Sequence, residues 1–197
     1  MEEFQAIKKH IEQYVQLTEE EEQFFFSLLR IVKVKKKQHL IEPGPVCRYR
    51  NFINQGTMRA YFVDAKGQDH TIAFGIEDWW ISDFNSFIFQ EPATLYVEAL
   101  EDATLVQIDY QSEQLLLETV PKFERVFRII GQRGYVFLQR RMLSSLSLSA
   151  EERYEQFFQK YPTIVQRVPQ YTLASYLGFT TEFLSKIRNK RAKKSSS

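Results

Sequence analysis

The residues from Pro169 to Lys194 constrain the fold most, because they predict two short helices joined by a tight turn. Apolar residues recur at helical spacing from Leu173 to Leu177, and Gly178 then ends the first helix. The small Ala174 lets two helices cross closely, and glycine suits the left-handed residue that follows a helix. A second helix starts at the Thr-Thr-Glu step after the turn.

The second of these helices has two unlike faces. Phe183, Leu184 and Ile187 fall on one face, and polar or basic residues cover the rest. A helix that reads duplex DNA needs this division, with one side packed and the other free. The candidate DNA-contacting residues are Thr180, Thr181, Glu182, Ser185, Lys186, Arg188, Lys190 and Arg191.

A solvated basic face on an ordinary helical bundle is the alternative to a binding surface. Lysine and arginine on a helix are usually of that kind. Here, however, the basic residues from Lys186 to Lys194 stand in a chain whose formal net charge is only +1. Positive charge is concentrated where a polyanion would lie, and this favours nucleic acid.

This segment resembles the helix-turn-helix of the Crp/Fnr family of bacterial transcription factors. In that family an arginine-glutamate pair early in the recognition helix, and an arginine one turn later, read base edges in the major groove. Thr181, Glu182 and Lys186 stand at these three positions, and only Glu182 is identical. The resemblance therefore implies how the helix would bind DNA, but it does not imply which base sequence the helix would recognise. We expect Glu182 and Lys186 to contact bases and the later basic residues to contact phosphates.

The composition fits a globular protein that is not an enzyme. With 197 residues, 44% of them hydrophobic, the chain can form one or two buried cores. The single cysteine, Cys47, excludes an internal disulfide, fits a reducing cytoplasm and argues against the multi-cysteine iron-sulfur cluster of the family's oxygen sensors. His10, His39 and His70 show no metal-binding spacing. We expect no cofactor, no catalytic site and, without a run of about 18 apolar residues, no membrane segment.

Two helices are predicted before the first strands. Residues from Phe4 to Leu17 carry apolar side chains at helical spacing, and Thr18 with Glu21 forms a candidate capping box for a helix from Glu19 to Leu29. The lysine-rich residues 33–37 alternate with apolar ones and indicate a strand or its flank. These lysines either guard an exposed strand edge or form a nucleic-acid patch, and the first reading is favoured.

Between His39 and Asp109 short strands alternate with turns, which predicts an antiparallel sandwich or barrel. The order and spacing of several short signals resemble the cyclic-nucleotide-binding jelly roll of the Crp/Fnr family. These signals are Pro43-Gly44, Phe52-Ile53, Gln55-Gly56, Arg59, Gly67 and Phe74-Gly75.

The resemblance implies an effector pocket that departs from the family's pattern. Nucleotide-binding members open the phosphate cassette with Gly-Glu and close it with Arg-Ser or Arg-Thr. Here Glu77 comes one position late after Gly75, and the closing pair is Ala93-Thr94, without arginine. A buried phosphate would lack its counter-charge, so cyclic AMP is not expected to bind in the usual way. The candidate pocket residues are Phe74, Gly75, Glu77, Trp79, Trp80, Ala93 and Thr94.

Two alternatives stay open for this cassette. Arg48, Arg50 or Arg59 could supply the missing charge from a neighbouring strand. The aromatic residues from Trp79 to Phe89 most simply pack a core, and otherwise they could line a pocket for an uncharged, apolar effector.

After the strands, a short helix from Ser112 to Glu118 precedes a long one from Lys122 to about Leu146. Apolar residues on more than one side of the long helix predict that a second copy of the chain covers part of it, as in the family's dimerisation helix. The candidate dimerisation residues are Phe123, Phe127, Ile130 and Phe137. A hinge follows, and Ser149 caps a helix from Ala150 to Lys160.

The sequence thus predicts an α+β protein with a jelly-roll sensor domain (1–120), a dimerisation helix (121–147) and a C-terminal (winged) helix-turn-helix domain (148–197). The expected function is that of a cytoplasmic, homodimeric transcription regulator that binds a palindromic operator. Double-stranded DNA, RNA polymerase and an unidentified small-molecule effector are the expected partners. The alternative is a ligand-binding or protein-interaction module whose C-terminal helices contact a protein.

Overall fold

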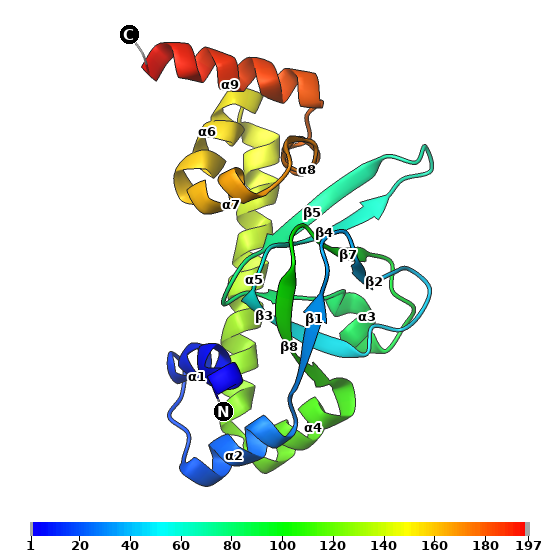
Figure 1. Ribbon diagram of the computed structural model, residues 1–197, viewed down its shortest axis with the longest axis vertical. Coiled ribbons are helices and arrows are strands. Elements are labelled where there is room, and N and C mark those ends of the chain that lie inside the picture. The colour runs from blue at the N-terminus through cyan, green and yellow to red at the C-terminus, as the bar shows by residue number, and fades with distance from the viewer. Residues whose placement is uncertain (1, 196–197) are drawn as a thin grey trace.

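The computed structural model describes the backbone of residues 2–195 and the side chains of residues 3–190. Helix α5 (Lys122–Ser147) runs along the molecule, with a β sandwich on one side (Figure 1). The N-terminal helices and α4 lie at one end of α5, and a group of C-terminal helices, here called the C-terminal module (α6 to α9), lies at the other. No helix in the described part of the chain is long and apolar enough to cross a membrane.

The β sandwich consists of two antiparallel four-stranded sheets, in the orders β1-β8-β3-β6 and β2-β7-β4-β5. Fully buried residues such as Ile53, Phe87, Val97 and Leu105 fill the space between the sheets. The predicted jelly-roll-type sandwich is therefore present. The strands are β1 (Arg30–Val34), β2 (His39–Ile41), β3 (Tyr49–Gln55), β4 (Met58–Val63), β5 (Asp69–Gly75), β6 (Trp80–Ile81), β7 (Tyr96–Ala99) and β8 (Ala103–Asp109).

Strand β1 lies at the edge of its sheet, where the lysine-rich segment was predicted to guard an edge. Lys33 is exposed on this strand, and Lys35 in the following turn pairs with Asp102 (Nζ to Oδ2, 2.8 Å). Exposed lysines discourage the pairing of a free edge with another strand.

The N-terminal helices are η1 (Glu2–Phe4), α1 (Gln5–Glu12) and α2 (Glu19–Ser27). The predicted capping box is confirmed, because the N–H of Glu21 donates to Thr18 Oγ1 (3.3 Å) and the N–H of Thr18 donates to Glu21 Oε2 (2.8 Å). Together with α4 (Tyr110–Thr119) and the first turns of α5, these helices bury a second core, in which the rings of Phe25 and Phe123 lie 4.6 Å apart.

The C-terminal module consists of α6 (Ala150–Lys160), α7 (Pro162–Arg167), α8 (Gln170–Leu177) and α9 (Thr181–Ser195). Ser149 and Glu152 form a capping box at the start of α6, where the sequence predicted a cap. Helix α7 was not predicted. It lies between α6 and α8, and no strand follows Asp109 in the described residues. The described residues of the C-terminal module therefore do not form the β-stranded wing that the sequence analysis included.

Candidate nucleic-acid interface

Helices α8 and α9 meet across a short turn whose backbone geometry depends on a glycine. Gly178 ends α8 in a left-handed conformation (φ 75°), which side-chain-bearing residues rarely adopt. The N–H of Phe179 then donates to the carbonyl of Ala174 at 2.8 Å. Thr180 caps α9, since its hydroxyl accepts from the N–H of Phe183 at 3.2 Å. The predicted helix, turn and helix is thus present.

Leu184 and Ile187 anchor α9 to the rest of the module. They are 0% and 6% exposed, respectively, and lie in the same buried cluster as Leu173 of α8. Phe183 was expected on this face too, but it is 42% exposed and its ring lies edge-on to Phe179 at 5.6 Å. Phe183 precedes Leu184 by one residue and is therefore rotated by about 100° from it around the helix.

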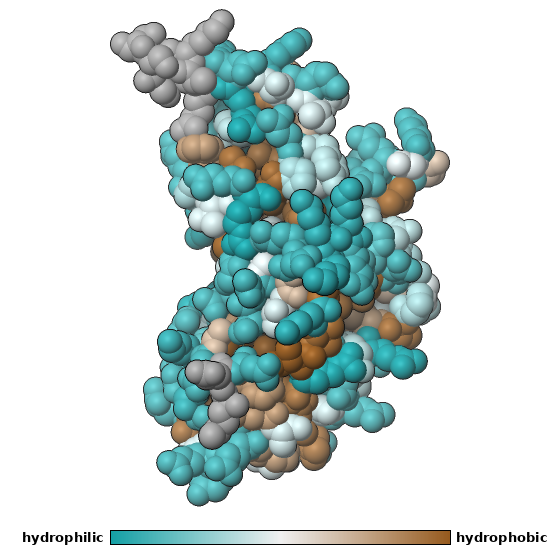
Figure 2. Space-filling view, in the orientation of Figure 1, coloured by the Kyte–Doolittle hydropathy of each residue, from teal (hydrophilic) through white to brown (hydrophobic). Residues whose placement is uncertain are grey.

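The opposite face of α9 is free of packing. Glu182, Lys186 and Asn189 are all exposed and follow one another at intervals of four and three residues, so they form one stripe along the helix. We call these three residues the α9 stripe. In Figure 2 the surface over α9 is mostly hydrophilic. Asn189 was missed from the sequence because it is neither apolar nor charged, although its helical spacing from Lys186 would have identified it.

Glu182 is ionised at neutral pH. Hydrogen bonds from its own backbone N–H and from the hydroxyl of Thr180 lower the pKa of its carboxyl group. The α9 stripe therefore presents a carboxylate, an ammonium group and an amide side by side. This set combines an acceptor, donors and a group that does both.

The other predicted contact residues flank the α9 stripe. Thr181 is exposed, whereas Ser185 and Arg188 are half-buried. Lys190 is exposed, and its Nζ lies 2.8 Å from Glu151 Oε1 at the start of α6. A phosphate group would have to replace that carboxylate as its partner. The side chain of Arg191 lies outside the described residues.

The C-terminal module is held on β5, an edge strand of its sheet, by polar contacts from α8 and α5. Ser175 Oγ donates to the carbonyl of Asp69 and accepts from the N–H of Thr71, both at 2.8 Å. Arg141 of α5 donates to the carbonyls of Thr71 (2.9 Å) and Tyr176 (3.0 Å). These contacts satisfy backbone groups of the edge strand and fix the direction in which α8, and therefore α9, points.

A second tie joins α7 to the sandwich. Arg167 Nη1 and Nη2 donate to Glu77 at 2.6 Å and 2.8 Å, and Arg167 Nε donates to Glu101 at 3.0 Å. Glu77 also accepts from the N–H of Gly56 at 2.8 Å. The hydrogen bonds from Arg167 lower the pKa of Glu77 to about 2. Glu77, expected in an effector pocket, is therefore engaged in holding the module.

The other predicted pocket residues are spread over separate packing environments rather than gathered around one cavity. Phe74 and Trp79 pack against the C-terminal module, whereas Trp80 packs against the N-terminal core. Ala93 lies between the sheets, and Gly75 is so close to Ile53 that a Cβ atom would lie 2.5 Å from its Cδ1. Neighbouring residues of an extended segment point to opposite faces, so residues that are adjacent in the sequence need not share a pocket.

A carboxylate of the chain itself occupies the segment that corresponds to the phosphate cassette. Asp83, 1% exposed, accepts from the N–H groups of Thr94 (2.8 Å), Leu95 (3.0 Å) and Ser86 (3.1 Å), the last at the start of helix α3 (Phe84–Phe89). Main-chain N–H groups at a helix start are favourable anion sites. Here these N–H groups, including that of Thr94, already donate to the side chain of Asp83.

Two of the three arginines that could have replaced the missing phosphate ligand, Arg50 and Arg59, are also engaged, whereas Arg48 is exposed. Arg50 forms a two-pronged ion pair with Glu113, with Nη2 2.7 Å from Oε1, and Arg59 Nε donates to Glu98 at 2.7 Å. Arg59 also pairs with Asp69 at 3.0 Å. Each of these guanidinium groups thus has carboxylate partners within its own sheet or on α4.

The predicted dimerisation residues face inward. Phe123 is fully buried in the N-terminal core, and Phe127 and Ile130 are half-buried against the same core. Phe137 packs against the C-terminal module, 6.4 Å from the ring of Trp79. The prediction that Phe123 contacts a second copy is wrong, because Phe123 is buried in the N-terminal core of its own chain. The large apolar residues exposed on α5, called the α5 stripe, are Tyr135, Val136, Leu138, Met142, Leu143 and Leu146.

No protein-family model matches this sequence, and no curated protein matches it. Solved structures do resemble the fold over most of its length. The c-di-GMP responsive global regulator CLP of Xanthomonas campestris is 13% identical with a TM-score of 0.73, covering 90% of this chain and 93% of CLP. FixK2 of Bradyrhizobium japonicum is 16% identical with a TM-score of 0.72, covering 85% and 86%.

A regulator assigned to the Crp/Fnr family in Eubacterium rectale is 15% identical with a TM-score of 0.70, covering 98% of this chain and 89% of that one. The fold of this chain is therefore that of the Crp/Fnr regulators, a cyclic-nucleotide-binding-type β domain followed by a helical C-terminal region. These structural neighbours are mainly transcription regulators rather than enzymes. Residues 3–190 contain no group of three or more His, Cys, Asp or Glu side chains placed to hold a metal ion.

Proposed function

We propose that this chain is a sequence-specific DNA-binding transcription regulator of the Crp/Fnr family. The observation that carries the proposal is the division of α9, which buries Leu184 and Ile187 and leaves the α9 stripe exposed. The stripe lies on a helix that follows a tight turn, at the end of the molecule remote from the N-terminal helices (Figure 1). This is the presentation that a recognition helix requires to enter a major groove.

The α9 stripe carries the chemistry for reading bases. The Lys186 ammonium can donate to the O6 and N7 acceptors of guanine, and the Glu182 carboxylate can accept from the amino group of cytosine. The Asn189 amide can both donate to and accept from adenine. Each good contact discriminates by about 1–3 kcal/mol. Arg188 and Lys190 flank the stripe and would bind phosphates, which sets affinity but not sequence.

The α5 stripe supports a homodimer. Gly134 lies one turn and Gly131 two turns before Leu138 on the same side of α5, and a Cβ atom at either glycine would meet nothing within 4 Å. Glycine inside a helix costs about 1 kcal/mol relative to alanine, and the packing of this chain gives no reason for it. Close approach of a second α5 would give one. A two-fold dimer would place its recognition helices about 34–36 Å apart and so select a palindromic operator.

In this proposal the chain divides into a sensor domain (1–120), the dimerisation helix (121–147) and a DNA-binding domain (148–197). The contacts of Ser175, Arg141 and Arg167 support a link between the first and the last, because each joins a C-terminal helix or α5 to the β sandwich. A conformational change in the sandwich would therefore alter the position of α9. RNA polymerase is the further partner that a regulator of this type would contact.

Duplex binding measured against salt distinguishes this proposal from a protein-interaction module. Arg188 and Lys190 of two copies give about four phosphate contacts, so affinity should fall about a hundredfold between about 0.05 and 0.2 M KCl. Fluorescence anisotropy with a labelled duplex gives this slope. Binding that is absent at low salt, or that ignores salt, would contradict the proposal, since a protein contact need not release counterions.

A further inference from the structure

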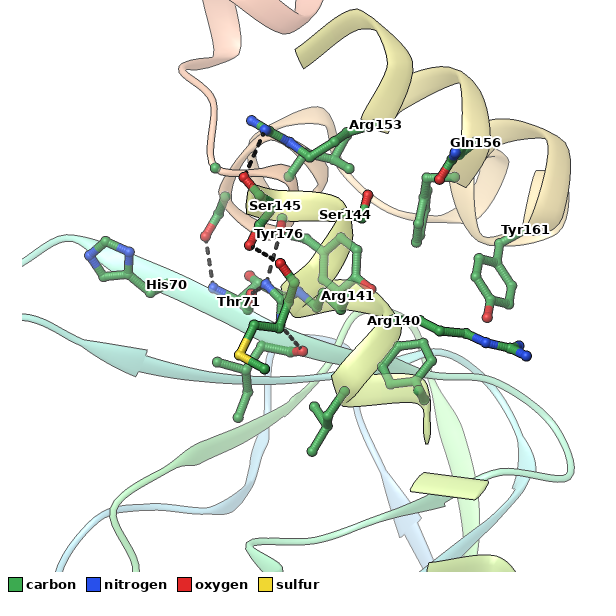
Figure 3. Close-up of a pocket in the computed structure, with 18 of the residues that line it drawn as sticks. His70, Thr71, Arg140, Arg141, Ser144, Ser145, Arg153, Gln156, Tyr161 and Tyr176 are labelled. Atoms are coloured by element: carbon green, nitrogen blue, oxygen red, sulfur yellow. Dashed lines mark hydrogen bonds between the residues drawn. The ribbon is translucent and has the colours of Figure 1, made fainter. Parts of the chain in front are cut away.

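A cleft of about 550 Å³ opens between α5, β5, α6 and the C-terminal end of α8 (Figure 3). We call it the interdomain cleft, because its walls come from the sandwich, the long helix and the C-terminal module. None of the described residues of α9 lines it. It is therefore separate from the α9 stripe and from the cassette around Asp83. Its volume lies within the usual range for small-molecule sites, about 300–1,000 Å³.

The charge of the cleft is one-sided. Arg140, Arg141, Arg153 and Lys160 line it, and no described aspartate or glutamate does. His70 also lines it, but its Nε2 lies 2.9 Å from Asp64 Oδ2, so it adds no unpaired charge. The whole chain, by contrast, carries 26 basic and 25 acidic residues. A gathering of cations without carboxylates raises the local concentration of anions.

The cations of the cleft are held by neutral groups. Arg141 donates to the carbonyls of Thr71 and Tyr176, and also to that of Ile72, while burial lowers its pKa. Arg153 Nη1 donates to the carbonyl of Leu148 at 2.9 Å. Carbonyl dipoles orient these guanidinium groups but leave their positive charge uncompensated.

Three groups in the cleft are available to a ligand. Arg153 Nε is buried and has no hydrogen-bond partner among the atoms that the structure describes. Arg140 and Lys160 are exposed, and neither forms an ion pair with any described side chain. A buried donor without a partner is destabilising, so a bound acceptor at this place would be stabilising.

Aromatic side chains form the apolar part of the walls. The rings of Phe62 and His70 are stacked with centroids 4.9 Å apart at the β5 side. Phe157, Tyr161 and Tyr176 line the side of the module. Flat rings pack well against such walls, and a cationic rim selects a negative charge. We propose that the interdomain cleft binds a small organic anion that carries an aromatic ring.

The test uses two fluorescent probes that differ by one charged group. 1-Anilinonaphthalene-8-sulfonate is an aromatic anion, and N-phenyl-1-naphthylamine is its neutral counterpart. The full chain is titrated with each, and stoichiometry is measured by calorimetry. We expect one sulfonate probe per chain, bound more weakly when KCl is raised from about 0.05 to about 0.5 M.

The decisive variant is the double change Arg140→Ala and Lys160→Ala, which removes two exposed charges and no buried contact. It should weaken binding of the sulfonate by at least about tenfold and leave the neutral probe unchanged. The matched control is Lys33→Ala with Lys36→Ala, which removes two charges from the exposed region around β1 and should change neither.

Three results would overturn the proposal. The first is sulfonate binding that changes by less than about twofold in the cleft variant. The second is an equal loss in the control variant, which would indicate a general charge effect. The third is competition by a short DNA duplex that depends on the same two residues, because the cleft would then belong to a nucleic-acid surface.

Discussion

Replacing Arg167 by methionine tests how the C-terminal module is held on the β sandwich. The Arg167 guanidinium donates to Glu77 at 2.6 Å and 2.8 Å and to Glu101 at 3.0 Å. Methionine keeps a flexible stem but removes all these donors. The change in free energy of unfolding therefore reports mainly on the ion-pair network.

An upper bound on the magnitude follows from the pKa of Glu77, which is lowered from 4.5 to about 2, mainly by the bonds from Arg167 and further by the N–H of Gly56. This difference of about 2.5 would correspond to about 3.4 kcal/mol for a group shielded from water. The Glu77 and Arg167 side chains are 38% and 25% exposed, so solvent screening reduces the figure to roughly 1–2 kcal/mol. We expect Arg167→Met to lower the free energy of unfolding by that amount at neutral pH.

The pH dependence has a definite sign. The folded-state pKa of Glu77 is depressed, so its contribution is complete above a pH of 4.5 and is lost as pH falls toward about 2. Wild type and variant should differ equally at pH values of about 7 and 6 and converge below about 4.5. Urea unfolding followed by tryptophan fluorescence measures both, because Trp79 packs against Tyr161 of the module.

Arg128→Met is the matched control, because Arg128 lies exposed on α5. It should change stability by less than about 0.5 kcal/mol. The reasoning is refuted if Arg167→Met costs no more than this control at neutral pH. It is also refuted if the difference between wild type and variant grows as the solution is acidified.

Four other predictions concern the module, the dimer and the cassette. Leu184→Ala should destabilise the protein by about 2–5 kcal/mol in urea unfolding, and a neutral result would mean that α9 is not anchored there. In anisotropy titrations Lys186→Ala should weaken the cognate duplex more than random DNA, whereas Lys190→Ala should weaken both alike. If Lys186→Ala also weakened both duplexes alike, Lys186 would not be a base-reading residue. Leu143→Glu should give a monomer by sedimentation. A dimer that persists in this variant would show that the α5 stripe is not the interface. Calorimetry should detect no micromolar binding of cyclic AMP, because Asp83 already occupies the N–H groups of the cassette.

Local signals in the sequence were sufficient where one short segment decides the structure. The caps at Thr18 and Ser149, and the left-handed Gly178, depend on residues within one helical turn. The alternating strands and the two faces of α9 could also be predicted, because periodicity reports which side of an element is buried.

Tertiary packing decided the points that the sequence could not. The apolar pattern of α5 shows that several sides need cover, but it does not show that Phe123 faces its own core while Leu143 is exposed. Trp79 and Trp80 are neighbours in the chain, yet they pack against opposite ends of the molecule. The interdomain cleft combines residues from β4 to α8, whose proximity no local pattern encodes.

Selection of bound sequences from random duplex DNA shows whether α9 reads a base sequence. We predict an inverted repeat whose half-sites lie about 10 base pairs apart, centre to centre. It further predicts that Lys186→Ala relaxes the preference at one position of each half-site without abolishing enrichment. Failure of the wild-type protein to enrich any sequence at low salt would contradict the claim that α9 reads DNA.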